Sequence, residues 1–138
     1  MTVPQAQCFH DSYARCRAQP HFLPRFYERF LGKGERIASR FEGVDMERQQ
    51  RMLRASLELV ILAATSGIDP GYFLAQMARR HARNQYNIPP ALYADWLGAL
   101  LETAAECDPS FDEEAHQVWV DVMSIGIRYM ISQYGAQD

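Results

Sequence analysis

Hydrophobic residues along the chain recur at intervals of three and four positions, which is the spacing of one face of an α-helix. The clearest case is the segment of residues 45–65. Its apolar stripe consists of Met46, Leu53, Leu57, Val60, Ile61 and Ala64. Such a stripe predicts an amphipathic helix with one buried face. The chain shows neither sustained apolar–polar alternation nor an Asn-Gly or Asp-Gly turn, so β-hairpins are not predicted.

Proline, glycine and capping residues divide this pattern into separate helices. The predicted helices span residues 4–17, 22–31, 35–41, 45–65, 69–81, 89–107 and 112–134. The fifth begins at Asp69, a capping residue, and Pro70, whose missing N–H costs nothing in a first turn. The sixth begins at Pro89-Pro90. Unequal helix lengths favour crossed-helix packing over an antiparallel bundle. We predict a single all-α domain over residues 1–138 with about six to eight helices.

Composition narrows the class of protein. A chain of 138 residues with 48% hydrophobic and 22% charged residues is typical of one globular domain with one core. The net charge of −3 and the lack of a basic stripe argue against nucleic-acid binding. The longest apolar run, residues 59–64, is too short to span a membrane, and residues 1–7 lack the pattern of a secretory signal. We therefore expect a cytoplasmic protein.

The sequence contains few side-chain motifs that could carry out chemistry without a cofactor. The chain has no GxSxG sequence, no glycine-rich phosphate loop and no HExxH sequence. Its three cysteines show no CxxC spacing, so neither a disulfide framework nor a zinc site is indicated. The exception is His81, which shares a helix face with Phe73 and Met77. It is either a partly buried histidine satisfied by a hydrogen bond or a residue that serves a cofactor, which would supply the reactive centre.

Six short motifs add to this pattern through their order and spacing. They are residues 26–30 (FYERF), Phe41, residues 49–53 (QQRML), residues 79–81 (RRH), Tyr93 and Trp96 with residues 97–101 (LGALL), and residues 113–119 (EEAHQVW). Together they cover about residues 9–134. In this order they resemble the globin family, in particular the bacterial single-domain globins and the haem domain of flavohaemoglobins.

The resemblance implies a globin-like packing of the helices around a pocket for haem b, iron protoporphyrin IX. His81 would be the proximal iron ligand. The residues expected to form the pocket walls are Phe41, Leu53, Met77, Ile88, Tyr93 and Trp96. For each of these, ordinary core packing is the alternative interpretation. The residues that could pair with the haem propionates are Arg48, Arg51, Arg79, Arg80 and Arg83, although a solvated basic face is the favoured interpretation for most of them.

Tyr27 and Gln49 are implied to face the sixth iron position, where each can donate a hydrogen bond to bound dioxygen. Gln49 is preferred over Gln50 because it lies four residues before Leu53 on the same helix face, but the register stays open. Residues 45–65 contain no histidine, so a second histidine ligand is not expected. A five-coordinate ferrous iron would then be open to oxygen, carbon monoxide or nitric oxide.

The sequence departs from the family pattern at the proximal side. The loop from His81 to Ile88 is about two residues longer than in many relatives, which leaves the orientation of the imidazole open. The glutamate that tunes the proximal histidine of flavohaemoglobins has no counterpart, so strong electron donation from that side is not expected. We expect no reductase segment after the domain.

The expected function is reversible binding of oxygen or a related diatomic gas, for transport, storage or sensing. One alternative is a haem enzyme, a nitric oxide dioxygenase or a peroxidase-like protein, that depends on an external reductase. A second alternative is a haem-free globin-like module for regulation or interaction. The sequence favours a gas-binding protein over an enzyme and leaves the oligomeric state open.

Overall fold

The computed structural model describes residues 1–83 and 85–135, and within these residues every regular element is a helix. The elements are α1 (Val3–Arg17), α2 (Phe22–Leu31), α3 (Glu35–Ala38), the 3-10 helix η1 (Ser39–Phe41), α4 (Met46–Thr65), α5 (Pro70–His81), α6 (Leu92–Cys107) and α7 (Glu113–Gln133). The prediction of an all-α fold with six to eight helices is therefore confirmed.

Local capping signals set most helix starts. The Asp45 carboxylate accepts a hydrogen bond from the backbone N–H of Arg48 at 3.2 Å, and α4 follows directly. Asp112 plays the same part before α7, where it accepts from Ala115 N at 2.8 Å. Each of these bonds satisfies an N–H that the first helical turn leaves unpaired. The predicted starts of these two helices, at residues 45 and 112, lie one residue before the observed starts.

The predicted start of the sixth helix at Pro89-Pro90 is wrong, because α6 begins at Leu92. Pro89 and Pro90 lie in the preceding turn, where their carbonyls accept from Leu92 N at 3.0 Å and Tyr93 N at 3.2 Å. A residue that precedes proline is pushed away from the helical region, so Pro89 does not adopt a helical conformation before Pro90. The two prolines therefore lead into the helix instead of forming its first turn.

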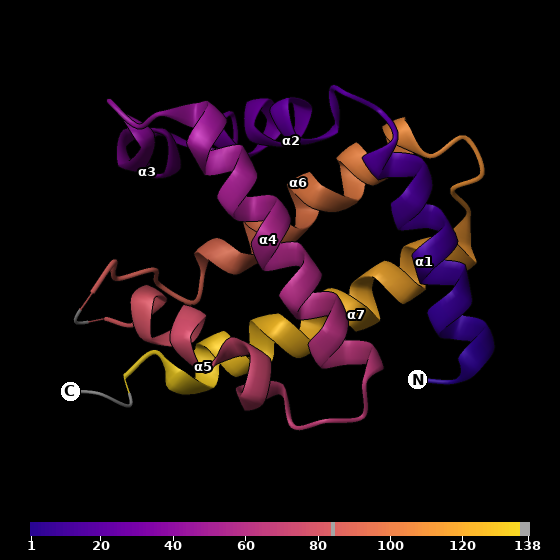
Figure 1. Cartoon of the computed structure of the whole chain (residues 1–138). Coiled ribbons are helices and arrows are strands. Elements are labelled where there is room, and N and C mark those ends of the chain that lie inside the picture. Colours follow the sequence, from indigo (N-terminus) through magenta and orange to yellow (C-terminus); the bar gives the residue numbers. More distant parts are fainter. Residues whose placement is uncertain (84, 136–138) are drawn as a thin grey trace.

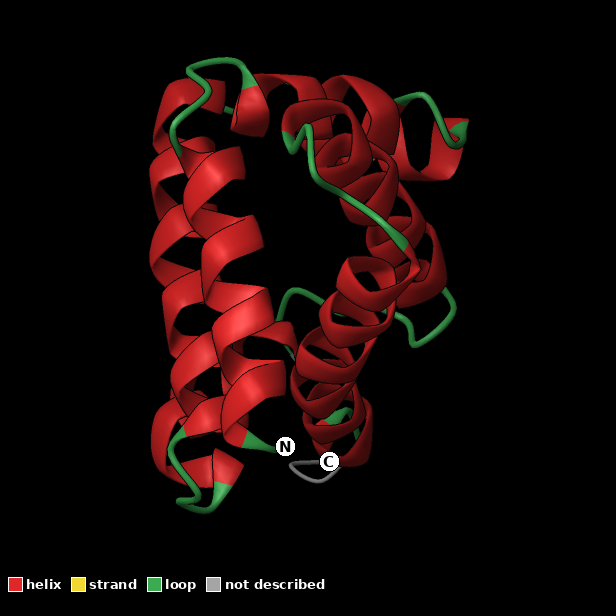
Figure 2. Cartoon of the chain, turned by 90° about the vertical axis from the view of Figure 1, so that its right-hand side faces the viewer, coloured by secondary structure: helices red, strands yellow, loops and turns green. Residues whose placement is uncertain are grey.

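The helices cross one another in two layers (Figure 1, Figure 2). Helix α4 runs across the molecule and packs on α5 and α7, while α2 packs on α6 and α1 packs on α7. Figure 2 shows the two layers from the side, with helices in red and loops in green. None of the helices among residues 1–83 and 85–135 is both long and apolar enough to cross a bilayer.

The α1–α6–α7 corner of the core combines buried aromatic side chains with a buried polar network. The Trp119 ring is fully buried and meets Phe9 edge-on, with ring centroids 4.9 Å apart. Its Nε1 donates to Ser12 Oγ at 2.9 Å, and Ser12 Oγ donates in turn to the buried carboxylate of Asp108 at 2.6 Å. Arg15 Nε also donates to Asp108, at 2.5 Å. This network fixes α1 against the turn that joins α6 to α7.

Helices α4 and α7 approach closely at Gly126. A Cβ atom at this position would lie 3.0 Å from Val60 Cγ1 and 3.1 Å from Val60 Cγ2. These distances are shorter than normal van der Waals contacts, so a larger residue would force the two helices apart. The close approach places Val60 and Gly126 at one end of the cavity described next.

Candidate functional site

A cavity of about 540 Å³ lies between the helices, which is within the range of sites for small molecules and cofactors. Residues of α2, α4, α5, α6 and α7 contribute to its walls, together with the segment that joins α2 to α4. The surface of the cavity is predominantly apolar. A flat apolar ligand would therefore bury its faces here without leaving many protein polar groups unpaired.

The structure places all nine sequence-predicted site residues on the wall of this one cavity. They are Tyr27, Phe41, Gln49, Leu53, Met77, His81, Ile88, Tyr93 and Trp96. Phe73, which shares the helix face of Met77 and His81, packs against the core and does not line the cavity. Residues separated by up to seventy positions in sequence are thus brought to one site.

His81 is the last residue of α5, and a hydrogen bond to its own helix fixes its ring. Its Nδ1 lies 2.8 Å from the Met77 carbonyl oxygen. Because a carbonyl only accepts, Nδ1 carries the proton and Nε2 keeps its electron pair. Burial lowers the pKa of His81 below its usual value. The hydrogen bond to the Met77 carbonyl acts to raise this pKa, whereas the positive charge of Arg80 lowers it further. The imidazole is consequently neutral near pH 7, the form that binds a metal ion.

The loop that follows His81 folds back onto the end of α5. Ile88 N donates to the His81 carbonyl at 3.1 Å, and Tyr86 N donates to the Arg80 carbonyl at 2.9 Å. The Tyr86 ring stands edge-on to the imidazole, with centroids 6.2 Å apart. The predicted extra length of this loop is therefore taken up by backbone bonds, and Tyr86 becomes a neighbour of His81 that the sequence did not reveal.

Tyr27 and Gln49 form a polar pair within the otherwise apolar wall. Gln49 Nε2 donates to Tyr27 Oη at 3.2 Å, which leaves the phenolic proton free for another acceptor. Burial raises the pKa of Tyr27 to about 12, although the Gln49 bond opposes the shift. Tyr27 therefore stays protonated and able to donate at physiological pH. Gln49 is among the residues that line the cavity, whereas Gln50 is not.

Three arginines lie where the cavity opens to solvent. Arg40, Arg48 and Arg80 are exposed and belong to its lining. Arg40 Nη1 donates to the Tyr86 carbonyl at 3.3 Å, and none of the three forms an ion pair with a carboxylate of the described chain. Their positive charges are thus available to an anionic group at the rim. Arg40 was not recognised from the sequence, since an isolated arginine in a short helical turn carries no pattern.

The wall contributed by α7 was also not recognised from the sequence. It consists of Met123, Gly126, Ile127 and Met130. Their spacing of three, four and seven residues is the pattern of one helix face, so a signal was present. Val118 and Val122 of the same helix are also buried, although they do not line the cavity. A helix that is apolar on several faces does not indicate which face meets a cavity.

No protein-family model and no curated protein matches the chain. Among solved structures, the chain is similar to protein PA3967 from Pseudomonas aeruginosa PAO1, a crystal structure described as structurally highly homologous to a human hemoglobin. The TM-score is 0.90 and the sequence identity is 36%, over 95% of this chain and 98% of that one. Identity of this size over nearly the full length of both chains indicates common ancestry as well as a common fold. The chain therefore belongs to the globin family.

Proposed function

We propose that the protein binds haem b in the cavity and holds its iron through His81. The chemistry of the site fits this group in three respects. The Nε2 of His81 carries an electron pair because the Met77 carbonyl fixes the proton on Nδ1. The walls are mainly apolar, as a porphyrin face requires. The rim carries Arg40, Arg48 and Arg80, which can pair with two propionates.

Haem supplies an iron centre at which a diatomic gas binds reversibly. The chain's contribution on the gas side is Tyr27, whose O–H is free to donate to a ligand that carries partial negative charge. Gln49 donates to the Tyr27 oxygen at 3.2 Å, which orients the hydroxyl and polarises it further. A hydrogen bond to a charged group contributes about 1.5–3 kcal/mol. Such a bond slows ligand loss by roughly ten- to hundredfold.

Reversible gas binding is favoured over turnover by the partner of His81. This partner is the neutral Met77 carbonyl, and no carboxylate of the described chain bonds the imidazole. A carboxylate partner raises the basicity of a metal-bound histidine, which is what cleavage of an oxygen–oxygen bond needs. A nitric oxide dioxygenase that relies on an external reductase is the second candidate, since the Tyr27–Gln49 pair would serve that reaction too.

The observation that carries the proposal is the Nδ1–Met77 bond of a neutral histidine on the wall of an apolar cavity. The test is titration of the protein with hemin, followed by absorption spectroscopy. We expect one equivalent to bind and to give a Soret band, and His81→Ala to weaken binding and alter the spectrum. His10→Ala is the matched control because His10 is exposed and away from the cavity.

A protein that does not take up hemin would contradict the proposal and would favour the haem-free module. A spectrum identical in the wild type and in His81→Ala would also contradict it. Repeated consumption of nitric oxide in the presence of a reductant would favour the dioxygenase over the reversible binder.

A further inference from the structure

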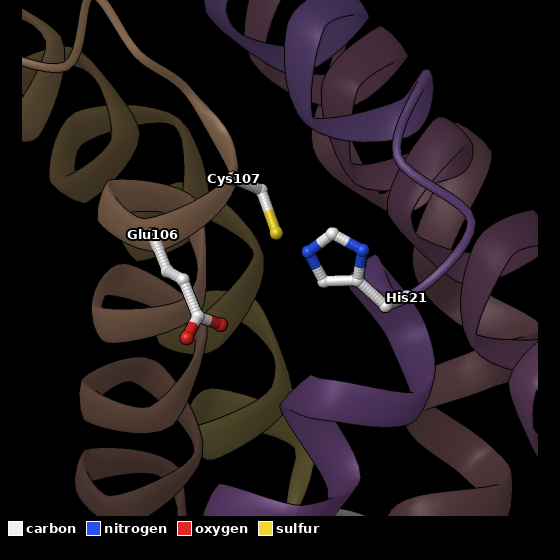
Figure 3. A group of neighbouring side chains, drawn as sticks. All are labelled: His21, Glu106 and Cys107. Atoms are coloured by element: carbon white, nitrogen blue, oxygen red, sulfur yellow. The ribbon is translucent and has the colours of Figure 1, made fainter.

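A second group of metal-ligating side chains lies outside the cavity, where the start of α2 meets the end of α6 (Figure 3). His21 is the residue that precedes α2, and Glu106 and Cys107 are the last two residues of α6. One ligand atom from each residue lies within 4.8 Å of the other two. None of the three lines the cavity.

His21 and Cys107 are both free to bind a ligand. Figure 3 shows the Cys107 sulfur pointing toward an imidazole nitrogen of His21. The imidazole is exposed and makes no capping bond to α2. Cys107 is an unoxidised thiol that is only 3% exposed. Within the described part of the chain, neither side chain has a hydrogen-bond partner, so a ligand would not need to displace one.

Glu106 is held in place by two arginines but keeps one oxygen largely available. Its Oε2 accepts from Arg25 Nε at 3.1 Å and from Arg29 Nη1 at 3.2 Å. Its Oε1 has only a longer contact of 3.4 Å to Arg25 Nε. A carboxylate has about four lone-pair positions, so Oε1 can serve as a ligand while Oε2 keeps the arginines.

We propose that His21, Glu106 and Cys107 form a surface site for a divalent metal ion of the Zn²⁺ class. A thiolate and an imidazole select ions of this class, whereas Ca²⁺ and Mg²⁺ prefer oxygen ligands. On binding, the Cys107 sulfur forms a bond to the metal and its proton passes to solvent. Three protein ligands leave the fourth tetrahedral position for a water on the exposed side.

The geometry requires only a small adjustment. Around a tetrahedral ion with Zn–S of about 2.3 Å and Zn–N of about 2.0 Å, neighbouring ligand atoms are roughly 3.5 Å apart. The ligand atoms here lie within 4.8 Å of one another, so a contraction of about 1 Å suffices. Rotation of the exposed His21 side chain, with a small shift of Glu106 that keeps the arginine bonds of its Oε2, can provide it, while buried Cys107 stays fixed. A bound ion would link the start of α2 to the end of α6.

The test is Zn²⁺ binding to the full chain by calorimetry, with X-ray absorption at the zinc edge to identify the ligands. We expect one equivalent of Zn²⁺ and one sulfur neighbour at about 2.3 Å. His21→Ala should weaken binding by at least about tenfold, since even indirect partners of a metal cost that much. Cys107→Ser should remove the sulfur neighbour. His10→Ala and Cys8→Ser are the matched controls and should bind like the wild type.

Three outcomes would overturn the site. They are no Zn²⁺ uptake, a zinc environment without sulfur, and equal affinity in the wild type and His21→Ala. Because His21 is exposed, His21→Ala should leave folding intact, and weaker Zn²⁺ binding in this variant would report the loss of a ligand. His81→Ala separates this site from the cavity, because loss of Zn²⁺ binding in that variant would place the ion at His81.

Discussion

The α1–α6–α7 corner and the cavity are both interior regions, but their packing differs. In the corner, Trp119 is completely enclosed, and Ser12 and Asp108 satisfy each other's polar groups. In the cavity, Trp96 and Tyr93 are only partly buried and line a space of about 540 Å³. Side chains that line a cavity have fewer protein packing partners than side chains enclosed in the core. The corner therefore stabilises the fold, whereas the side chains of the cavity wall have surface available for contact with a ligand.

The two tryptophans of the chain provide the strongest test of this contrast. Trp119→Ala removes a fully buried ring and should lower the free energy of unfolding by about 3–5 kcal/mol. Trp96→Ala enlarges a space that already exists, so its cost without ligand should be less than half as large. Its main effect should be weaker hemin binding. Urea unfolding of both variants checks this, and equal losses of stability would contradict the contrast.

Asp108 tests the polar part of the corner. Asp108→Asn removes a charged acceptor from Ser12 and Arg15 and should cost about 1–3 kcal/mol of unfolding free energy. Hemin binding should not change, because Asp108 does not line the cavity. Chemical denaturation at pH 7 measures the first effect and hemin titration the second.

The pH dependence of stability gives a separate signature of the same residue. Burial acts to raise the pKa of Asp108, but hydrogen bonds from Arg15, Ser12 and the Ser110 N–H outweigh it, so the pKa is lowered. The carboxylate thus stabilises the fold above the ordinary pKa of about 4. This stability is lost as the pH falls through the folded-state pKa. Asp108→Asn should show a shallower loss below about pH 4, and parallel curves would exclude this role.

Tyr27 tests the cavity, because its substitution should change ligand dissociation more than it changes the stability of the fold. Tyr27→Phe keeps the ring and removes the hydroxyl that is free to donate. Oxygen dissociation should become faster by about tenfold or more. Gln49→Leu should produce a smaller increase because Gln49 acts through the Tyr27 hydroxyl. Flash photolysis or stopped-flow mixing measures both rates, and an unchanged rate in Tyr27→Phe would remove Tyr27 from the proposed role.

Two helical glycines, Gly126 in α7 and Gly98 in α6, provide the test with the smallest expected effect. Gly126→Ala places a Cβ 3.0 Å from Val60 Cγ1. Overpacking of about 1–3 kcal/mol, partly offset by better helix propensity of about 1 kcal/mol, should give a net loss of roughly 1 kcal/mol. Gly98→Ala meets only Lys33 Nζ at 3.9 Å. It should stabilise the protein by about 0.5–1 kcal/mol. Thermal unfolding measures both, and shifts of the same sign would contradict the account of α4–α7 packing.

The sequence predicted what local rules determine. The cap at Asp69 located the start of α5 because the capping bond joins residues only two positions apart. The preference for proline in a first helical turn predicts a helix that begins at Pro89-Pro90. Proline also disfavours the helical conformation of the residue before it, so the helix begins later. The resemblance to the globin family implied that Tyr27, Gln49 and His81 share one site, and the structure places all three on the wall of one cavity.

Contacts between segments that are distant in sequence leave no pattern in the local sequence. His21 and Cys107 do not have zinc-type spacing along the chain, and they come together in the structure because α2 packs on α6. The α7 wall at Met123 and Met130 was missed because several faces of that helix are apolar. Spacing along one helix identifies its buried faces, whereas the partner of each face depends on how the helices cross.

The central claim is that His81 Nε2 binds the iron of a haem. The most direct measurement is the resonance Raman spectrum of the hemin-loaded, reduced protein, in which an iron–histidine stretching band reports this bond. The account predicts the band in the wild type, its loss in His81→Gly and the appearance of an iron–imidazole band when free imidazole is added to that variant. A band that persists unchanged in His81→Gly without added imidazole would show that another residue binds the iron and would contradict the account.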